Sequence, residues 1–343
     1  MPATREPIGG VFALEEPVRQ ADGETLLERW SKGAAAVHLF HNARSALSHI
    51  LNSMQPSRLW LPAYLCPDTL QAVPDGLTLL YYPVGSTLEP NFEVLESEMR
   101  AGDAVLGIAY FGRLQPSVWR SMAERRQDIL WIEDYAQALD TGGGPLSSLR
   151  IYSPRKLLGA PDGGILVDTD GKVPAPLLEL PGDTKFIDPY RMRAADPAGQ
   201  HNEHWYAAFR SVEAAMAVSN KAMSAESRRI LARTAVAPMA KTRRGNYRTL
   251  LETLSPHALF GDLPIDWVPL GFPMRFEDAD GLCAWLAEHR VFAPRHWRDL
   301  PSPESDFPEE HALSRSLLTL PCDQRYGEDD MRFMAELVER YIG

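Results

Sequence analysis

Two side chains of complementary chemistry, a carboxylate and an amine, lie near one another in the middle of the sequence. Asp134 stands just beyond an apolar run, residues 129–132, that is typical of a buried strand. Lys156 follows a second run of strand type, residues 149–152, and precedes a glycine turn. In open α/β sheets, ligands bind at the carboxyl ends of the strands. The spacing therefore predicts that Asp134 and Lys156 meet in one ligand crevice.

A buried carboxylate and a lysine amine are together what a carbonyl cofactor such as pyridoxal 5′-phosphate needs. The lysine holds the aldehyde as a Schiff base, and the ring withdraws electrons only while its pyridine nitrogen stays protonated, which a buried carboxylate enforces. A close opposite charge shifts such an equilibrium by roughly 1 to 3 pK units, or about 1.4 to 4 kcal/mol. Each residue alone would be common on a solvated surface, so the interpretation depends on their combined order.

The order of residues in this stretch resembles a known family signature. IEDYAQAL, followed by YSPRK and a glycine turn, is similar to the EDxAQA … K … GG pattern of the DegT/DnrJ sugar aminotransferases, which are fold-type I pyridoxal phosphate enzymes. The resemblance implies that Asp134 pairs with the ring nitrogen, Gln137 approaches the ring hydroxyl and Lys156 carries the aldimine. Many members have a serine five positions before the lysine. Here that position is Ile151, so Ser153 becomes the candidate phosphate contact.

A phosphate site is also expected where an apolar segment turns into a helix in LFHNARSALSHILNSM. A helix N-terminus offers free amides and the positive end of the helix dipole. The segment resembles the family's GTxAL turn, which implies phosphate contacts from Ala43, Arg44 and Ser45, although Arg44 replaces a small hydroxyl residue. The residues alone leave a second interpretation open, in which Asn42 or Ser45 is a plain helix N-cap.

Two further segments resemble family motifs with substitutions at the functional position. RLWLPAYLCPDTL is similar to PxxTFxAT, whose aromatic residue stacks on the cofactor ring; Cys66 stands there and Tyr64 lies two residues earlier. Both either contact the ring or pack under the turn. DPYRM resembles NYRM, whose asparagine reaches the cofactor phosphate of the other subunit. Pro189 replaces that asparagine, so Tyr190 or Arg191 would have to act instead.

Composition excludes several other classes of function. The 343-residue chain has a formal net charge of -11 with acids and bases interspersed, which is unlike a nucleic-acid-binding or anionic-membrane-binding surface. The three cysteines lack CxxC spacing, so neither a disulfide framework nor a metal site is expected. No apolar run approaches the ~18 residues of a membrane span, and no secretory signal is visible. We therefore expect a cytoplasmic protein with small-molecule substrates.

Strand and helix patterns alternate through the first half of the chain, which is typical of a mostly parallel sheet with helices on both faces. We expect an N-terminal segment (1–35), a large cofactor-binding domain (36–235) and a smaller α/β domain (236–343). In the small domain, Arg295 and His296 match a family turn that faces the active site. Residues 174–202 read as a long loop, and Gly142–Gly144 as a hairpin turn. Expected strands are 37–40, 59–61, 77–82, 104–111, 129–132, 149–152, 163–168, 267–276, 291–293 and 317–320; expected helices begin at 24, 43, 68, 92, 116, 203, 236, 279 and 328.

The resemblance implies a pyridoxal phosphate aminotransferase that forms a homodimer. It would move an amino group from an amino acid such as glutamate to a keto acceptor, a nucleotide-linked keto sugar. Two alternatives stay open. A pyridoxal phosphate lyase or dehydratase is disfavoured because members that dehydrate tend to lose the lysine that Lys156 represents. A non-catalytic or regulatory protein on the same scaffold is allowed by the substitutions at Cys66, Ile151 and Pro189.

Overall fold

The computed structural model describes residues 5–16, 23–139, 147–182 and 184–343, and its centre is a seven-stranded sheet. The strand order is β2-β8-β7-β6-β5-β3-β4. Strand β8 runs antiparallel to both neighbours, whereas the other pairs are parallel, so the expected mostly parallel sheet is confirmed. The bounds are β2 Ala36–Phe40, β3 Arg58–Pro62, β4 Thr78–Tyr82, β5 Ala104–Ile108, β6 Leu130–Asp134, β7 Leu149–Tyr152 and β8 Gly164–Asp168.

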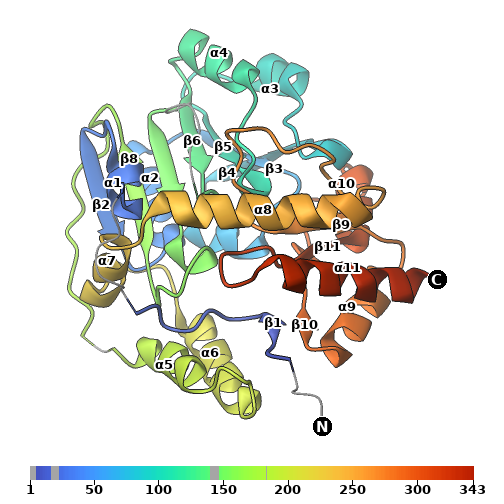
Figure 1. The fold of residues 1–343 in the computed structure, drawn as a ribbon. Coiled ribbons are helices and arrows are strands. Elements are labelled where there is room, and N and C mark those ends of the chain that lie inside the picture. The colour runs from blue at the N-terminus through green and yellow to red at the C-terminus, as the bar shows by residue number, and fades with distance from the viewer. Residues whose placement is uncertain (1–4, 17–22, 140–146, 183) are drawn as a thin grey trace.

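Helices cover this sheet and explain why its central strands are apolar on both faces. Every residue of β5 and of β8 is buried, as expected for strands between two helical layers. Gly107 of β5 is required by this packing, because a Cβ there would lie 2.5 Å from the Trp119 ring of α4. The helices of this half are α1 Leu26–Ser31, α2 Ala43–Met54, α3 Phe92–Glu98 and α4 Ser117–Arg125, with α3 and α4 at the top of Figure 1.

The C-terminal third forms a second, smaller α/β unit. Strands β9 (Phe272–Arg275) and β11 (Leu317–Leu320) pair antiparallel, and the long helix α8 (Val236–Leu254) crosses the middle of the molecule beside α11 (Figure 1). The N-terminal strand β1 (Ile8–Gly9) joins this unit by pairing with β10 (Val291–Phe292). The remaining helices are α9 Ala279–Glu288, α10 Pro308–Ser316 and α11 Glu328–Ile342. The expected domain boundaries stay a prediction.

The stretch between the two units differs from the sequence-based prediction. Residues 174–202, expected as a loop, contain α5 (Asp188–Ala195), whose Pro189 occupies the first turn, where a backbone N–H is not needed. The helical run expected over 203–235 is divided into α6 (Asn202–Ala215) and α7 (Ala225–Leu231). Between them the chain is extended, because Met223 N donates to Leu39 O and His41 N donates to Lys221 O at the edge of β2.

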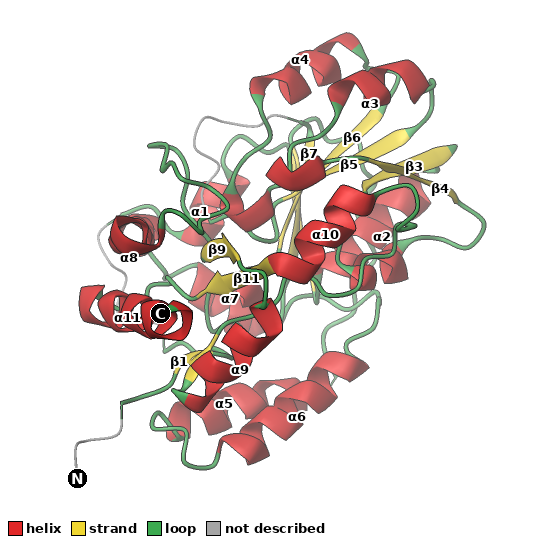
Figure 2. Cartoon of the chain, turned by 90° about the vertical axis from the view of Figure 1, so that its right-hand side faces the viewer, coloured by secondary structure: helices red, strands yellow, loops and turns green. Residues whose placement is uncertain are grey.

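Other differences are local. The helix expected from residue 68 is a short 3₁₀ helix, Pro67–Ala72, and the expected strand 267–276 is confined to β9. Helix α10 was not expected from the sequence. The expected Gly142–Gly144 turn lies outside the described residues. Figure 2 shows the sheet nearly edge-on, with α5 and α6 together on the far side of the small unit from α3 and α4. No helix among the described residues is long and apolar enough to cross a membrane.

Candidate active site

Asp134 is the last residue of β6, at the carboxyl end of the parallel strands. It is in register with Ile108 of β5 and Ile151 of β7, and its Oδ1 accepts a hydrogen bond from Ala136 N at 2.8 Å. Burial raises the pKa of its carboxyl group, while the nearby Lys156 ammonium and the Ala136 amide oppose that shift. The structure therefore places a half-buried acid within electrostatic reach of Lys156, as the sequence predicts.

Lys156 ends a 3₁₀ turn, Pro154–Lys156, that directly follows β7. Its backbone N–H donates to Ser153 O at 3.3 Å, and its side chain lines a cavity of about 900 Å³. Cys66, His296 and Trp297 line the same cavity. Lys156 is exposed and lines this cavity, so a bound ligand has room to reach its amine.

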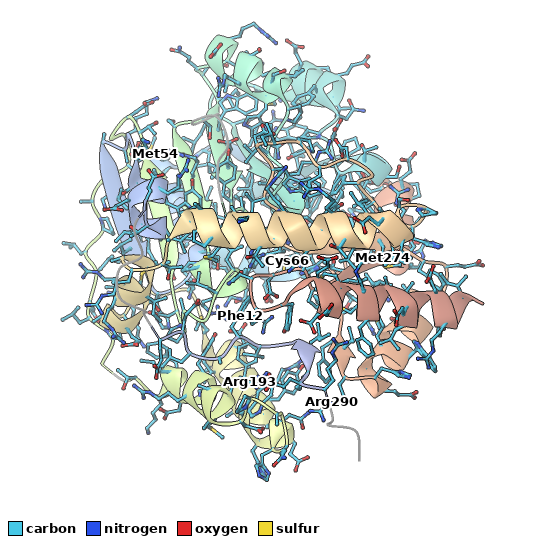
Figure 3. The ribbon with its side chains drawn as sticks, viewed as in Figure 1. Phe12, Met54, Cys66, Arg193, Met274 and Arg290 are labelled. Carbon is cyan, nitrogen blue, oxygen red and sulfur yellow. The ribbon has the colours of Figure 1, made fainter. Side chains whose placement is uncertain are left out.

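Besides Cys66 and Lys156, the cavity is lined by three parts of the chain that are distant in sequence. The N-terminal segment contributes Phe12, the α5–α6 pair contributes Tyr190, Arg193, Trp205, Tyr206 and Phe209, and the small unit contributes Leu270, His296, Trp297 and Thr319. In Figure 3, Cys66, Phe12 and Arg193 follow one another from the centre of the molecule towards α5. Apolar surface predominates in the lining, which is typical of a small-molecule site.

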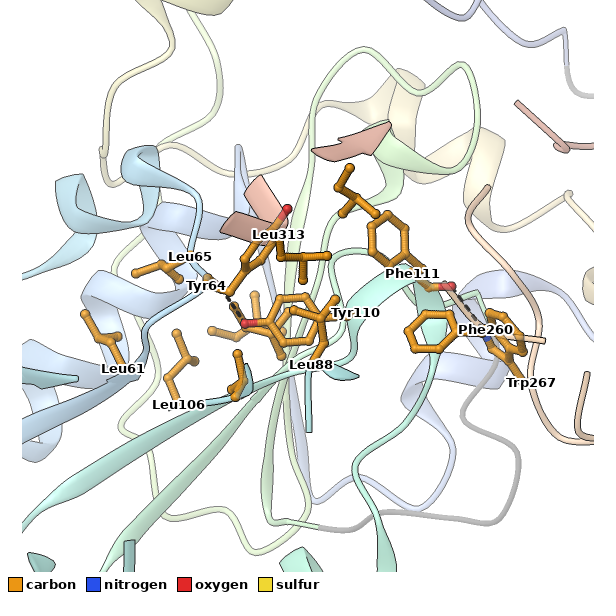
Figure 4. Close-up of a cluster of buried hydrophobic side chains, with 14 of the residues drawn as sticks. Leu61, Tyr64, Leu65, Leu88, Leu106, Tyr110, Phe111, Phe260, Trp267 and Leu313 are labelled. Carbon is orange, nitrogen blue, oxygen red and sulfur yellow. Dashed lines mark hydrogen bonds between the residues drawn. The ribbon is translucent and has the colours of Figure 1, made fainter. Parts of the chain in front are cut away.

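Cys66 and Tyr64, the two candidates for contact with a cofactor ring, have different surroundings. Cys66 lines the cavity, and burial raises the pKa of its thiol although the Lys156 charge opposes this. Tyr64 is fully buried, donates its hydroxyl to His296 O and accepts a hydrogen bond from Tyr110 at its carbonyl (Figure 4). Of the two, only Cys66 is positioned to face a ligand.

Arg295 and His296 were expected on a turn that faces the active site, and of the two His296 lines the cavity. Its Nδ1 lies 3.0 Å from Thr319 Oγ1, and burial, followed by the positive charge of Lys156, lowers the pKa of the ring to about 3. The imidazole is therefore neutral at physiological pH. Arg295 instead binds the carbonyls of Ser314, Arg315 and Leu317 and pairs with Asp280, so it supports the turn from behind.

Gln137 and Ser153 lie close to the strand ends but do not line the cavity. Gln137 is buried, and its Oε1 accepts a hydrogen bond from Phe111 N at 2.6 Å. Phe111 has a φ of 54°, so Gln137 stabilises a strained turn after β5. Ser153 is also buried and uses its carbonyl for the Lys156 amide. Their expected contacts with a cofactor stay predictions.

The N-terminus of α2, expected to bind phosphate, is satisfied within the chain. Asn42 Oδ1 accepts from Ser45 N at 2.8 Å and from the Ser45 hydroxyl at 3.1 Å, so the N-cap interpretation of Asn42 is confirmed. Ser45 Oγ in turn accepts from Ser219 N at 3.0 Å, and Arg44 donates to Met216 O. Ala43, Arg44 and Ser45 do not line the cavity that contains Lys156, and their phosphate role stays a prediction.

The DPYRM segment lies on α5. Tyr190 lines the cavity and its hydroxyl is 3.5 Å from Arg155 Nε. Arg191 is exposed and pairs with Asp188 at 3.1 Å, so of these two residues Tyr190 faces the site. Sequence reasoning did not identify Arg155, which directly precedes Lys156, as a lining residue. It also missed Arg193 and the aromatic residues of α6, because only the fold of the α5–α6 pair brings them to Lys156.

The residues present fit pyridoxal phosphate at its reactive end. A desolvated Asp134 beside the Lys156 amine matches a protonated ring nitrogen beside an imine-forming lysine. The fit at the phosphate end is less complete, because Asn42 and Ser219 already occupy the hydrogen-bonding groups of Ser45. Among the described residues, no group of acids, histidines and cysteines is arranged to hold a metal ion.

No protein-family model and no curated protein sequence matches the chain. Solved structures do match it over nearly its whole length. Spr1654 from Streptococcus pneumoniae, assigned as a sugar aminotransferase, superposes in its PLP form with a TM-score of 0.68 and 12% identity, covering 96% of this chain and 97% of Spr1654. A DegT/DnrJ/EryC1/StrS aminotransferase from Brucella abortus gives 0.64 and 17% identity, covering 95% and 92%.

DesI, solved in the presence of its TDP-sugar product, also superposes with a TM-score of 0.64 and 17% identity, covering 97% of this chain and 93% of DesI. At such low identity the likeness concerns the fold. The structural resemblance expected from the EDYAQA and lysine motifs is thereby confirmed. The chain has the fold of the DegT/DnrJ-type sugar aminotransferases.

Proposed function

We propose that the protein is a pyridoxal phosphate-dependent aminotransferase that transfers an amino group from an amino acid, glutamate, to a keto sugar linked to a nucleotide. The observation that carries this proposal is the Asp134–Lys156 pair at the cavity. Burial raises the pKa of Asp134 and the Lys156 charge opposes the shift, so the two groups interact electrostatically. Lys156 lines a cavity of about 900 Å³ that can admit substrate.

The chain's own residues have distinct roles in this proposal. Bound at Lys156, pyridoxal phosphate supplies an electron sink for bond cleavage at the amino-bearing carbon. Asp134 holds a proton at the ring nitrogen, because a buried anion stabilises a nearby cation. Lys156 first holds the cofactor and then, once substrate has displaced it, carries the proton at its Nζ as general base and acid. His296 stays neutral beside it, so it adds no competing positive charge.

The size and lining of the cavity support a large acceptor. Its volume is at the upper end of the roughly 300 to 1,000 Å³ that small-molecule sites span. Tyr206 and Phe209 are stacked with ring centroids 6.5 Å apart, and the Arg193 guanidinium lies 5.2 Å above the Trp205 ring. A nucleotide offers a base for aromatic faces and phosphates for arginines. The neighbour DesI was solved with a TDP-sugar product.

Spectroscopy of the purified protein tests the proposal. We expect a yellow protein after addition of pyridoxal phosphate, and borohydride reduction followed by peptide mapping should place the adduct on Lys156. Glutamate should bleach the colour and a keto acceptor should restore it. Lys156→Ala should abolish the adduct, whereas Lys172→Ala should not, because Lys172 is exposed and paired with Asp170. An adduct on Lys156 with no bleaching by any amino acid would favour the lyase or dehydratase alternative. A protein that takes up no cofactor would favour the non-catalytic one.

We further propose a homodimer located in the cytoplasm. The family resemblance implies two subunits that meet near the cofactor. Cys66, Cys283 and Cys322 are free thiols in the structure, which suits a reducing compartment.

A further inference from the structure

Arg243, on the long helix α8, is a buried cation at the wall of the cavity that contains Lys156, and the function proposed above gives it no role. Its side chain is 0% exposed. Its Nη2 donates to Leu157 O at 2.8 Å, its Nη1 donates to Pro269 O and Leu270 O at 3.2 and 2.9 Å, and its Nε donates to Gln324 Oε1 at 2.9 Å. These acceptors belong to three segments that are far apart in sequence. One guanidinium therefore connects three parts of the chain.

The acceptors are neutral carbonyl and amide oxygens. Burying a charge on neutral partners is unfavourable unless nearly every donor is satisfied, so the position of each acceptor matters. Burial lowers the pKa of Arg243 and the nearby Asp323 opposes that shift, but the carboxylate of Asp323 is held by Arg325 at 2.8 and 2.9 Å. The hydrogen bonds of Arg243 therefore hold the three segments in place relative to one another. The ion pair beside it is formed by Arg325 and Asp323.

One of the connected segments is the turn that presents Lys156. Leu157 directly follows the lysine, and its carbonyl accepts from both Arg243 Nη2 and Gln324 Nε2, the latter at 2.9 Å. Pro269 and Leu270 lead into β9, and Gln324 lies in the loop before α11, so both belong to the smaller unit. The Lys156 turn is consequently hydrogen-bonded to the unit that closes the other side of the cavity.

We propose that Arg243 is a positioning residue: through the Leu157 carbonyl it holds the Lys156 turn at the site and makes the placement of that turn depend on the small unit. This inference rests on the proposed function, since it takes Lys156 as the cofactor-binding lysine. The role requires a guanidinium. A planar fork of five donors reaches three segments at once, whereas a lysine ammonium at the same position cannot.

The chain offers a matched control in the neighbouring arginine. Arg244 is half-buried on the same helix and donates to the carbonyls of Leu263, Pro264 and Trp267, but it has no bond to the Lys156 turn. Arg243→Lys and Arg244→Lys each keep a positive charge and remove a fork that binds carbonyls. Comparing the two separates a loss of general packing from a loss of the connection to Leu157. Gln324→Ala is a third variant that leaves the bond from Arg243 Nη2 to Leu157 O in place, but removes the second bond to that carbonyl and the acceptor of Arg243 Nε.

Hydrogen exchange on the protein without added cofactor is the first readout. The amides of Leu157 and Leu158 donate to Pro154 O at 2.9 and 3.1 Å, so their exchange reports opening of the turn. In Arg243→Lys we expect these two amides to exchange at least about tenfold faster than in the wild-type protein, because a charge-assisted hydrogen bond is lost. The increase should be smaller in Gln324→Ala, and Arg244→Lys should exchange at the wild-type rate. Equal exchange in Arg243→Lys and Arg244→Lys would overturn the proposal.

The second readout is the pH titration of the visible absorbance after cofactor addition. We expect the midpoint to move in Arg243→Lys and in Gln324→Ala but not in Arg244→Lys, since only the first two alter how Lys156 is held. If the midpoint is unchanged in both Arg243→Lys and Gln324→Ala, the proposal is also overturned. If the wild-type protein binds no cofactor, the proposed function fails, whereas the difference in exchange at Leu157 and Leu158 can still be measured. The two failures are therefore distinguishable.

Discussion

Replacing Asp134 by asparagine removes a charge while keeping the shape of the site. The amide oxygen can still accept the 2.8 Å hydrogen bond from Ala136 N, so the strand end should keep its structure. A neutral amide cannot hold a ring nitrogen protonated. Because Asp134 is desolvated, the lost attraction corresponds to roughly 1 to 3 pK units at that nitrogen. We therefore expect Asp134→Asn to bind the cofactor but to lose about tenfold to a thousandfold in rate.

The assay is the rate at which saturating glutamate bleaches the visible band in a single turnover, with bound cofactor quantified separately. Glu133→Gln is the matched control. Neighbouring residues of a strand point to opposite faces, and Glu133 bonds Ser147 N and Oγ, both at 2.9 Å, away from Lys156. Near-wild-type bleaching in Asp134→Asn would refute the assignment of Asp134 as the ring partner. An equal loss of bleaching rate in Glu133→Gln would show that the rate depends on any buried charge on β6 and not on the position of Asp134.

Three further outcomes are expected. Burial raises the pKa of Glu133 to about 7 from 4.5, so folding stability should fall as pH rises through the window from 4.5 to 7, by about 3 kcal/mol in total. Glu133→Gln should flatten that dependence in thermal melts at pH 5 and 8, and an unchanged slope would contradict it. Asp162→Ala should destabilise the fold by about 3 to 5 kcal/mol in urea unfolding, because this fully buried carboxylate accepts from Ser224 N at 2.8 Å and from His41 Nδ1 at 3.0 Å. A loss below about 1 kcal/mol would show that water replaces those bonds. Sedimentation at micromolar concentration should give twice the 38.3 kDa chain mass, and an active monomer would refute the dimer.

The sequence by itself predicted the central sheet and the closeness of Asp134 to Lys156. Strand periodicity and the positions of turns are local properties, so the runs that end at Asp134 and at Tyr152 could be assigned without contacts. The strand ends then placed Asp134 and Lys156 together, because the parallel strands β6 and β7 are neighbours. The α8 helix was also expected, since its apolar residues follow helical spacing.

The tertiary structure alone decided which residues surround that pair. The Asn42 cap of α2 is local, but the bond from Ser219 N to Ser45 Oγ joins positions 174 residues apart, and no local pattern encodes it. The α5–α6 pair lines the cavity, and the extended segment after α6 is bound to the edge of β2 by bonds between positions far apart in sequence. Arg243 reads in the sequence as one basic residue of a polar helix. Its buried bond to Leu157 joins positions 86 residues apart, and such contacts form only after the two units pack, because side-chain burial depends on elements far away in the chain.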